Sequence, residues 1–216
     1  MALMRSSEIP KDAIVVDELE ASEYMWDIVY NWKDLSDVWA LRHGSTILGG
    51  INAMSGILMN YHYRTKLKLG NYGYLSSVIP VSLMPAMLTI LFHRYSITTN
   101  ILLIKETCPL CYELRSSAIQ LTLGTAYPLL LAPTGALMLA SRYNTHRVPE
   151  LKKGPKVLFE FVRKLTKPFS GALTTLSLIQ VAASSVVTYF ELKNNIVFRN
   201  KLIDIEQKIL QSKSNL

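Results

Sequence analysis

The chain has 216 residues, of which half are hydrophobic and only 18% are charged. Its mean hydropathy of +0.21 is high for a soluble domain. A net charge of +7 would favour nucleic-acid binding in a soluble protein, but the charge pattern has a better explanation in a membrane protein, so nucleic acid is not expected as a partner. Two cysteines exclude the disulfide framework of small secreted domains.

Four long windows contain no Lys, Arg, Asp or Glu. They cover residues 43–63, 69–93, 116–141 and 168–190, with lengths of 21, 25, 26 and 23 residues. A helix needs about 20 apolar residues to cross a bilayer, and a soluble helix seldom stays uncharged for so long because one face must meet water. The sequence therefore predicts an all-α fold, a four-helix transmembrane bundle with amphipathic N-terminal, loop and C-terminal helices.

The chain is expected to divide into three parts. An acidic tail and an amphipathic helix occupy residues 1–43, a four-span membrane domain occupies 44–190, and an amphipathic tail occupies 191–216. The four spans are predicted at about 45–63, 74–93, 117–141 and 169–190.

The loops at one end of the predicted bundle are strongly basic. Residues 64–68 and 142–167 together contain 11 Lys or Arg against two acids, whereas the tails and the 94–115 loop contain 12 against 14 acids. With four spans these two groups lie on opposite sides of the membrane. Such asymmetry is typical of an orientation signal and of attraction to anionic lipid.

The first helix in chain order is expected at about residues 18–39. Its apolar residues follow helical spacing, and it contains all three tryptophans, Trp26, Trp32 and Trp39. Two interpretations stay open, with a plain solvated helix behind both. The helix lies at the membrane interface with its tryptophans at the headgroup level, or, since acids cover its other face, it docks on a partner protein.

The first span is rich in small residues. Small residues let helix backbones approach closely, and asparagines hydrogen-bond across such an interface. We expect this surface to pack inside the chain's own bundle in preference to a partner's helix. The predicted helix-packing residues are Gly49, Gly50, Asn52, Ala53, Gly56 and Asn60.

Two prolines lie in the second span, Pro80 and Pro85, and two in the third, Pro128 and Pro133. Proline within a membrane helix removes a backbone hydrogen bond and commonly leaves a kink. We expect these two spans to depart from a regular helix.

A basic amphipathic helix is expected before the fourth span. From Val157 to Leu165 an apolar stripe is flanked by Lys and Arg, a pattern suited to lying on an anionic leaflet. The predicted contacts with anionic lipid are Lys152, Lys153, Lys156, Arg163, Lys164 and Lys167.

The motif that most resembles a reactive site is Cys108-Pro109-Leu110-Cys111. Thiol oxidoreductases place such a pair at a helix N-terminus after a strand, and no strand pattern precedes this one. A zinc site needs four ligands, and no second Cys or His pair accompanies it. A structural disulfide between Cys108 and Cys111, or two unreactive thiols, is therefore favoured over a redox site.

The predicted spans contain none of the charged residues that transporters and pumps usually bury to bind ions or relay protons. The sequence also lacks a phosphate-binding glycine loop, a nucleophile elbow and an HExxH motif. We expect no catalytic residue, no metal site and no cofactor, and we interpret the chain as a scaffold. The alternatives are a small transporter or channel and, less favoured, a membrane thiol oxidoreductase.

Several motifs together resemble one family. The stretch GGINAMSGILMNYHYR resembles the G-x-N-A-x-x-G-L-I-x-N-x-x-x-R segment of the transmembrane protein 126 family, with matches at Gly50, Asn52, Ala53, Gly56, Asn60 and Arg64. The later order of Cys108, Cys111, Arg115-Ser116 and Tyr127-Pro128 is similar to that family's C-x-x-C, R-S and Y-P motifs, and Leu139 to Tyr143 looks like its L-A-x-R-Y. The resemblance covers roughly residues 45 to 190.

This resemblance implies a multi-pass protein of the mitochondrial inner membrane. Its implied role is non-enzymatic, as an assembly factor, chaperone or scaffold that helps build the membrane arm of respiratory complex I. The implied partners are complex I membrane-arm subunits and other assembly factors. Membrane lipids, cardiolipin among them, are further candidate partners.

Overall fold

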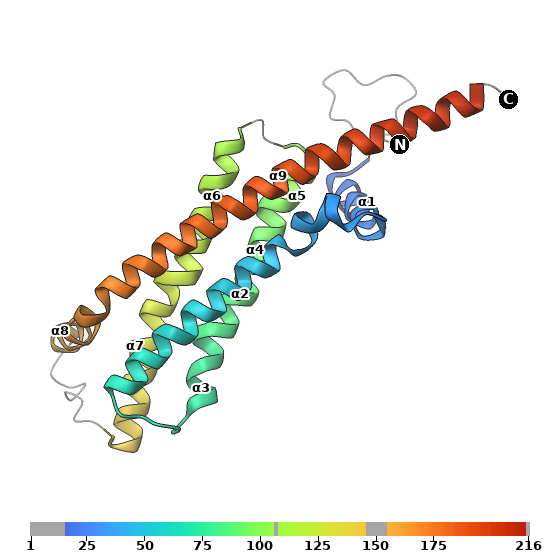
Figure 1. The fold of residues 1–216 in the computed structure, drawn as a ribbon. Helices are drawn as coiled ribbons and strands as arrows, with labels where there is room; N and C mark the ends of the chain where they lie inside the picture. The colour runs from blue at the N-terminus through green and yellow to red at the C-terminus, as the bar shows by residue number, and fades with distance from the viewer. Residues whose placement is uncertain (1–15, 106–107, 146–154, 215–216) are drawn as a thin grey trace.

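The structure, a computed structural model, describes residues 16–105, 108–145 and 155–214. All regular structure in these residues is helical, which confirms the all-α fold class. Long helices lie side by side in an elongated bundle, with α1 at one end and α8 across the other (Figure 1). The bounds in chain order are α1 (Glu18–Asn31), α2 (Leu35–Lys66), α3 (Tyr74–Val78), η1 (Ile79–Leu83), α4 (Met84–His93), η2 (Arg94–Thr98), α5 (Thr99–Leu102), α6 (Pro109–Leu121), η3 (Thr122–Ala126), α7 (Tyr127–Tyr143), α8 (Pro155–Thr166), η5 (Lys167–Phe169) and α9 (Ser170–Ser214).

Three helices of the described residues are long and apolar enough to cross a membrane. They are Tyr74–Leu102, which joins α3 to α5, Pro109–Tyr143, which joins α6 and α7, and Phe159–Ile209, which contains most of α8 and α9. They contain the second, third and fourth predicted spans and extend beyond each of them. Three helices thus meet the requirements of a membrane span, and the bundle of four spans stays a prediction.

The helix with the remaining predicted span, α2, is long but less apolar. It has 32 residues and packs against α4, α7 and α9. Its buried residues include polar side chains such as Asn52, Ser55 and Asn60, which face other helices, so its mean hydropathy falls below that of the other three. The span at 45–63 stays a prediction.

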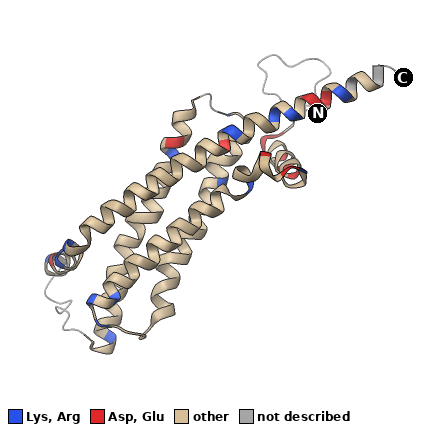
Figure 2. Cartoon of the chain, in the orientation of Figure 1, with Lys and Arg blue, Asp and Glu red and all other residues tan. Residues whose placement is uncertain are grey.

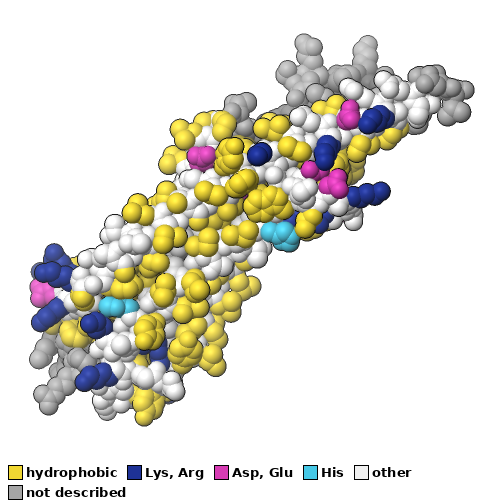
Figure 3. Space-filling model, in the orientation of Figure 1, with side chains coloured by type: hydrophobic (Ala, Val, Ile, Leu, Met, Phe, Trp, Pro, Cys, Tyr) yellow, Lys and Arg dark blue, Asp and Glu magenta, His cyan; other side chains and the backbone are white. Residues whose placement is uncertain are grey.

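The path of the chain places the charges as the loop composition predicted. α2, the α3–α5 helix, the α6–α7 helix and α9 run alternately up and down the bundle (Figure 1). Lys and Arg gather where α2, α7 and α8 meet, and most acids lie at the opposite end, around α1 and the C-terminal half of α9 (Figure 2). Hydrophobic side chains cover much of the middle of the face seen in Figure 3.

The segment expected as one helix at residues 18–39 is two helices. α1 ends where Trp32 adopts extended backbone, and α2 begins after Asp34. The Arg42 guanidinium donates to the carbonyls of Val29, Tyr30 and Trp32 at 2.7, 2.5 and 3.2 Å. Because the last carbonyls of a helix have no intrahelical donor, Arg42 stabilises this break.

The first helix packs on its own chain. Met25 and Val29 are buried with Val38, Leu102 and Phe198 in one apolar cluster. The Arg94 guanidinium lies 4.1 Å from the centre of the Trp26 ring, a cation–π contact. Neither sequence interpretation foresaw this packing, because α1 meets residues far along the chain.

Pro80 and Pro128, in the predicted second and third spans, lie in or next to a π turn, so both helices depart from regular α-helix, as expected. Pro80 lies within η1, and Pro128 follows η3 by two residues. In η3 the N–H of Tyr127 reaches the carbonyl of Thr122, five residues back. Single π turns of this kind frequently accompany functional positions in helices.

Candidate functional site

A layer of amide and hydroxyl side chains crosses the middle of the bundle. Asn52 of α2 donates through Nδ2 to Thr89 Oγ1 of α4 at 2.6 Å. Gln120 of α6 donates through Nε2 to Gln180 Oε1 of α9 at 2.7 Å and to the Leu48 carbonyl at 3.2 Å. All four side chains are buried. Buried polar groups cost free energy unless they are paired, so this layer selects the arrangement in which all four helices meet.

Gly124 in η3 makes room for this layer. A Cβ atom at Gly124 would lie 2.6 Å from Gln180 Nε2 and even closer to Asn52 Oδ1. Pro128 has no N–H to donate to the Gly124 carbonyl, and Ser55 Oγ of α2 donates to that carbonyl at 2.7 Å instead. The proline thus frees a backbone acceptor that holds α2 against η3.

A second buried layer contains the ionisable pair His93 and Glu191. His93 Nε2 lies 3.1 and 3.2 Å from the two Glu191 carboxylate oxygens, and the side chains are only 1% and 0% exposed. Thr98 Oγ1 of η2 donates to Glu191 Oε1 at 3.2 Å, and Ser116 Oγ lies 3.4 Å from His93 Nδ1. Gly44 of α2 leaves room for the Glu191 carboxylate, because a Cβ atom at this position would lie 2.7 Å from Glu191 Oε1.

Arg64 at the basic end of α2 holds the turn that follows. Its guanidinium donates to the carbonyls of Gly70 and Tyr72 at 2.7 and 2.8 Å and to Ser77 Oγ at 2.8 Å. Gly70 has a φ of +50°, a backbone conformation that glycine adopts without a Cβ clash. Arg64 is therefore a buried structural cation that fixes the turn between α2 and α3.

The predicted packing residues on α2 separate into two groups. Gly49, Asn52, Gly56 and Asn60 are buried, and a Cβ at Gly56 would lie 2.5 Å from the Val81 carbonyl. Gly50 is exposed, with no atom within 4 Å of its Cβ position. Ala53 is partly buried. Gly50 therefore lies outside the packing within this chain, because one residue along a helix turns the side chain by about 100°.

Cys108 and Cys111 lie at the start of α6, where Cys108 is the N-cap residue. Both cysteines are exposed, and the Cys111 N–H donates to the Cys108 carbonyl at 3.2 Å. The disulfide between them stays a prediction. Within residues 16–105, 108–145 and 155–214, no group of three His, Cys, Asp or Glu side chains is placed to hold a metal ion.

The basic amphipathic helix forms as α8, and part of its apolar stripe packs on the bundle. Phe161, Val162 and Leu165 pack against the apolar cluster formed by α2 and α7. Lys156, Arg163, Lys164 and Lys167 are exposed. Lys152 and Lys153 lie outside the described residues. The helix is therefore held by protein contacts and presents its cations outward.

Sequence patterns alone missed Glu191, His93 and Gln120. Glu191 directly follows the uncharged window 168–190, and His93 ends the window 69–93, so both lie at the edge of a predicted span and neither is predicted as a site residue. The sequence does contain one signal for the pair. His93 and Glu191 stand at the ends of two uncharged windows that finish on the same side of the predicted bundle. Their pairing depends on how far each helix continues beyond its uncharged window.

Comparison with known proteins supports the motif resemblance. The model of the transmembrane protein 126 family matches residues 22–198. A Drosophila melanogaster protein named transmembrane protein 126 is 39% identical over 212 residues, which cover 97% of this chain and 95% of that protein. The match thus includes α1 and nearly all of the bundle.

More distant relatives occur in mammals. A mouse protein named complex I assembly factor TMEM126B, mitochondrial, is 29% identical over 110 residues, which cover 50% of this chain and 46% of that protein. Transmembrane protein 126A of the rat is 24% identical over 68% of this chain and 72% of its own length. No solved structure gives a significant match.

Proposed function

Because the chain belongs to the transmembrane protein 126 family, we propose that it is a multi-pass protein of the mitochondrial inner membrane that helps assemble the membrane arm of respiratory complex I. The observation that carries this proposal is the mouse relative whose name states that it is a mitochondrial complex I assembly factor. In this proposal the chain acts without catalysis, as a scaffold for membrane-arm subunits and other assembly factors.

The buried layers support a scaffold role in physical terms. Their polar groups bond to one another across helices, as in Asn52 with Thr89 and Gln120 with Gln180. Interhelical hydrogen bonds of this kind fix one arrangement of helices in a bilayer. In the proposed four-span arrangement α2 is the first span, at 45–63, enclosed by α4, α7 and α9.

Deletion of the gene tests the proposal. Mitochondria without the protein are expected to accumulate membrane-arm subunits in subcomplexes on native gels, and re-expression of the intact chain is expected to restore complex I. A normal level of assembled complex I in the deletion strain would contradict the proposal.

A Cys108→Ser/Cys111→Ser variant is expected to restore assembly, since the scaffold role does not use thiol chemistry. Failure to restore it would favour the thiol oxidoreductase.

A small transporter is the second candidate, and the buried His93 and Glu191 pair favours it. An ionisable residue inside a membrane domain is, by default, a candidate for binding ions or relaying protons. Purified protein reconstituted in vesicles separates the two functions. The scaffold predicts no proton or solute flux above that of empty vesicles, whereas flux that disappears in a Glu191→Gln variant would establish transport.

A further inference from the structure

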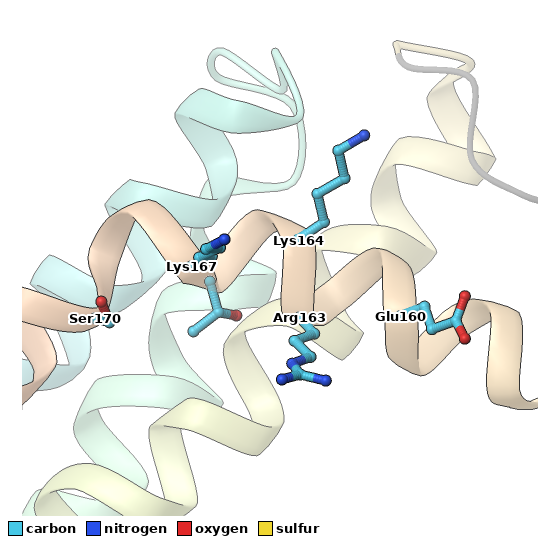
Figure 4. Close-up of a pocket in the computed structure, with 6 residues that line it drawn as sticks. Glu160, Arg163, Lys164, Lys167 and Ser170 are labelled. Atoms are coloured by element: carbon cyan, nitrogen blue, oxygen red, sulfur yellow. The ribbon is translucent and has the colours of Figure 1, made fainter.

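A pocket lies where α8 turns into α9 at the basic end of the bundle. It has a volume of about 450 Å³ and is lined by Glu160, Arg163, Lys164, Thr166, Lys167 and Ser170. Lys164 extends to one side of the ribbon and Arg163 to the other, with Lys167 one turn further on (Figure 4). Positive charge therefore surrounds the turn from α8 into η5.

The charge of this pocket is mainly positive. Three cations line it against one acid, Glu160. In the part of the chain that the structure describes, no acid forms an ion pair with Arg163, Lys164 or Lys167. An excess of positive charge around a pocket attracts anions. The pocket therefore favours an anionic ligand.

Contacts from α2 hold the pocket in place. The His62 ring stacks on Phe169 with centroids 4.2 Å apart, and its Nε2 lies 3.3 Å from the Leu165 carbonyl. The Tyr63 hydroxyl lies 2.8 Å from Thr166 Oγ1. These contacts fix both ends of the α8–α9 turn, so the cations are presented on a rigid element and not on a free loop.

Exposed apolar side chains lie near the pocket. Phe159, on the preceding turn of α8, is 69% exposed, and Leu178, two turns into α9, is 66% exposed. The apolar helix Phe159–Ile209 includes the pocket near its start. A site with cations at the end of an apolar helix and exposed apolar side chains beside it matches a lipid with a charged headgroup and acyl chains.

We propose that this pocket binds the phosphate of an anionic phospholipid, with the acyl chains along the exposed face of α9. Arg163 supplies a planar guanidinium for the phosphate oxygens, and Lys164 and Lys167 supply point charges. The hydroxyl of Ser170 is available as a further donor. The bound lipid secures the α8–α9 turn at the membrane surface.

Lipid retention by the full chain tests the proposal. The purified protein in mild detergent is mixed with cardiolipin and phosphatidylcholine, and bound lipid is measured by native mass spectrometry. The wild type is expected to retain cardiolipin in preference to phosphatidylcholine. The variant Arg163→Gln/Lys164→Gln/Lys167→Gln is expected to lose at least about tenfold in cardiolipin affinity, since each cation near an anionic surface contributes to binding.

A matched variant removes the same number of cations from the same end of the bundle but outside the pocket, as Lys66→Gln/Lys68→Gln/Arg142→Gln. Its cardiolipin affinity is expected to stay within about twofold of the wild type, because scattered surface charges are screened by salt and contribute little to the binding of one lipid. An equal loss in the two variants would overturn the pocket, since general surface charge would then explain binding. Full retention by the pocket variant would also overturn it.

Two further measurements separate a binding defect from misfolding and lipid from free phosphate. A charge-conserving variant, Arg163→Lys/Lys164→Arg/Lys167→Arg, is expected to retain cardiolipin, and a loss equal to that of the glutamine variant would overturn the charge argument. Inorganic phosphate is expected to leave bound cardiolipin in place. Displacement of cardiolipin by inorganic phosphate at equal concentration would assign the site to a soluble anion.

Discussion

His93 and Glu191 lie 98 residues apart in the sequence, and their side chains meet 3.1 Å apart in the buried interior of the bundle. The contact joins α4 to α9 in one layer, and Thr98 and Ser116 bring η2 and α6 into the same layer. Burial of polar groups requires hydrogen-bond partners to offset the loss of water. The pair therefore fixes the position of α9 along the other helices.

Glu191→Ala is expected to destabilise the protein by about 3 kcal/mol, because it leaves His93 and Thr98 buried without their partner. Thermal unfolding in detergent measures the effect. The control Asp204→Asn removes an exposed acid of the same helix that pairs with Lys208, and it is expected to cost less than about 0.5 kcal/mol. Equal losses in the two variants would show that the buried pair has no special role.

Gly56→Ala is expected to be strongly destabilising, by about 2 kcal/mol or more, because the added Cβ would lie 2.5 Å from the Val81 backbone carbonyl. Backbone cannot move aside as a flexible side chain can. Gly50→Ala is the matched substitution on the same helix, in open space, and is expected to leave stability unchanged or raise it by up to about 1 kcal/mol. Chemical denaturation of the two variants in detergent gives the comparison; similar stabilities would contradict close packing at Gly56.

Arg64→Gln is expected to cost about 2 kcal/mol, because the carbonyls of Gly70 and Tyr72 lose a charged donor. Amide hydrogen exchange in residues 67–73 is expected to accelerate with it. Lys66→Gln, two residues away and exposed, is the control and is expected to leave exchange in this turn at the wild-type rate. Unchanged exchange in the Arg64 variant would argue against its role in the turn.

The contact between Asp37 and Lys201 is expected to weaken in acid. A hydrogen bond from Lys201 lowers the pKa of Asp37 below its usual 3.8, and a hydrogen bond from Trp32 adds to this effect. Since the folded pKa lies below the unfolded one, the contribution to stability is present above pH 3.8 and is lost as the pH falls through the folded pKa.

Fluorescence of Trp32 in a Trp26→Phe/Trp39→Phe background measures this acid transition, because the Trp32 indole N–H donates to Asp37 Oδ2 at 3.2 Å. A change in emission is expected below pH 3.8 and is expected to be absent in Asp37→Asn. The same transition in the Asp37→Asn variant would assign it to another group.

Much of the fold follows from local sequence. Uncharged windows predict helices that can cross a membrane. A charged side chain is costly in hydrocarbon whichever residues surround it, so this signal does not depend on tertiary contacts. The prolines at 80 and 128 likewise predict irregular turns, since a missing N–H acts within one helix. The break between α1 and α2 was missed, because Arg42 stabilises it from the next helix.

The candidate site was predicted only in part. Asn52 and Gly56 were identified as packing residues from the small-residue composition around them, but their partners Thr89 and Val81 were not. Glycine spacing indicates that a surface can approach another, without indicating which one. Phe161, Val162 and Leu165 of α8 pack on the bundle. The sequence alone does not indicate this contact, because amphipathic spacing is the same for a lipid surface and a protein surface.

The sequence by itself determined the class of the protein, three of its membrane helices and the separation of charge between its two ends, since all of these depend on composition over a window of residues. Only the tertiary structure decided which polar groups meet. His93 finds Glu191, Gln120 finds Gln180, and Ser55 finds the Gly124 carbonyl. Hydrogen bonds act over about 3 Å, so their partners depend on how helices distant in sequence are packed.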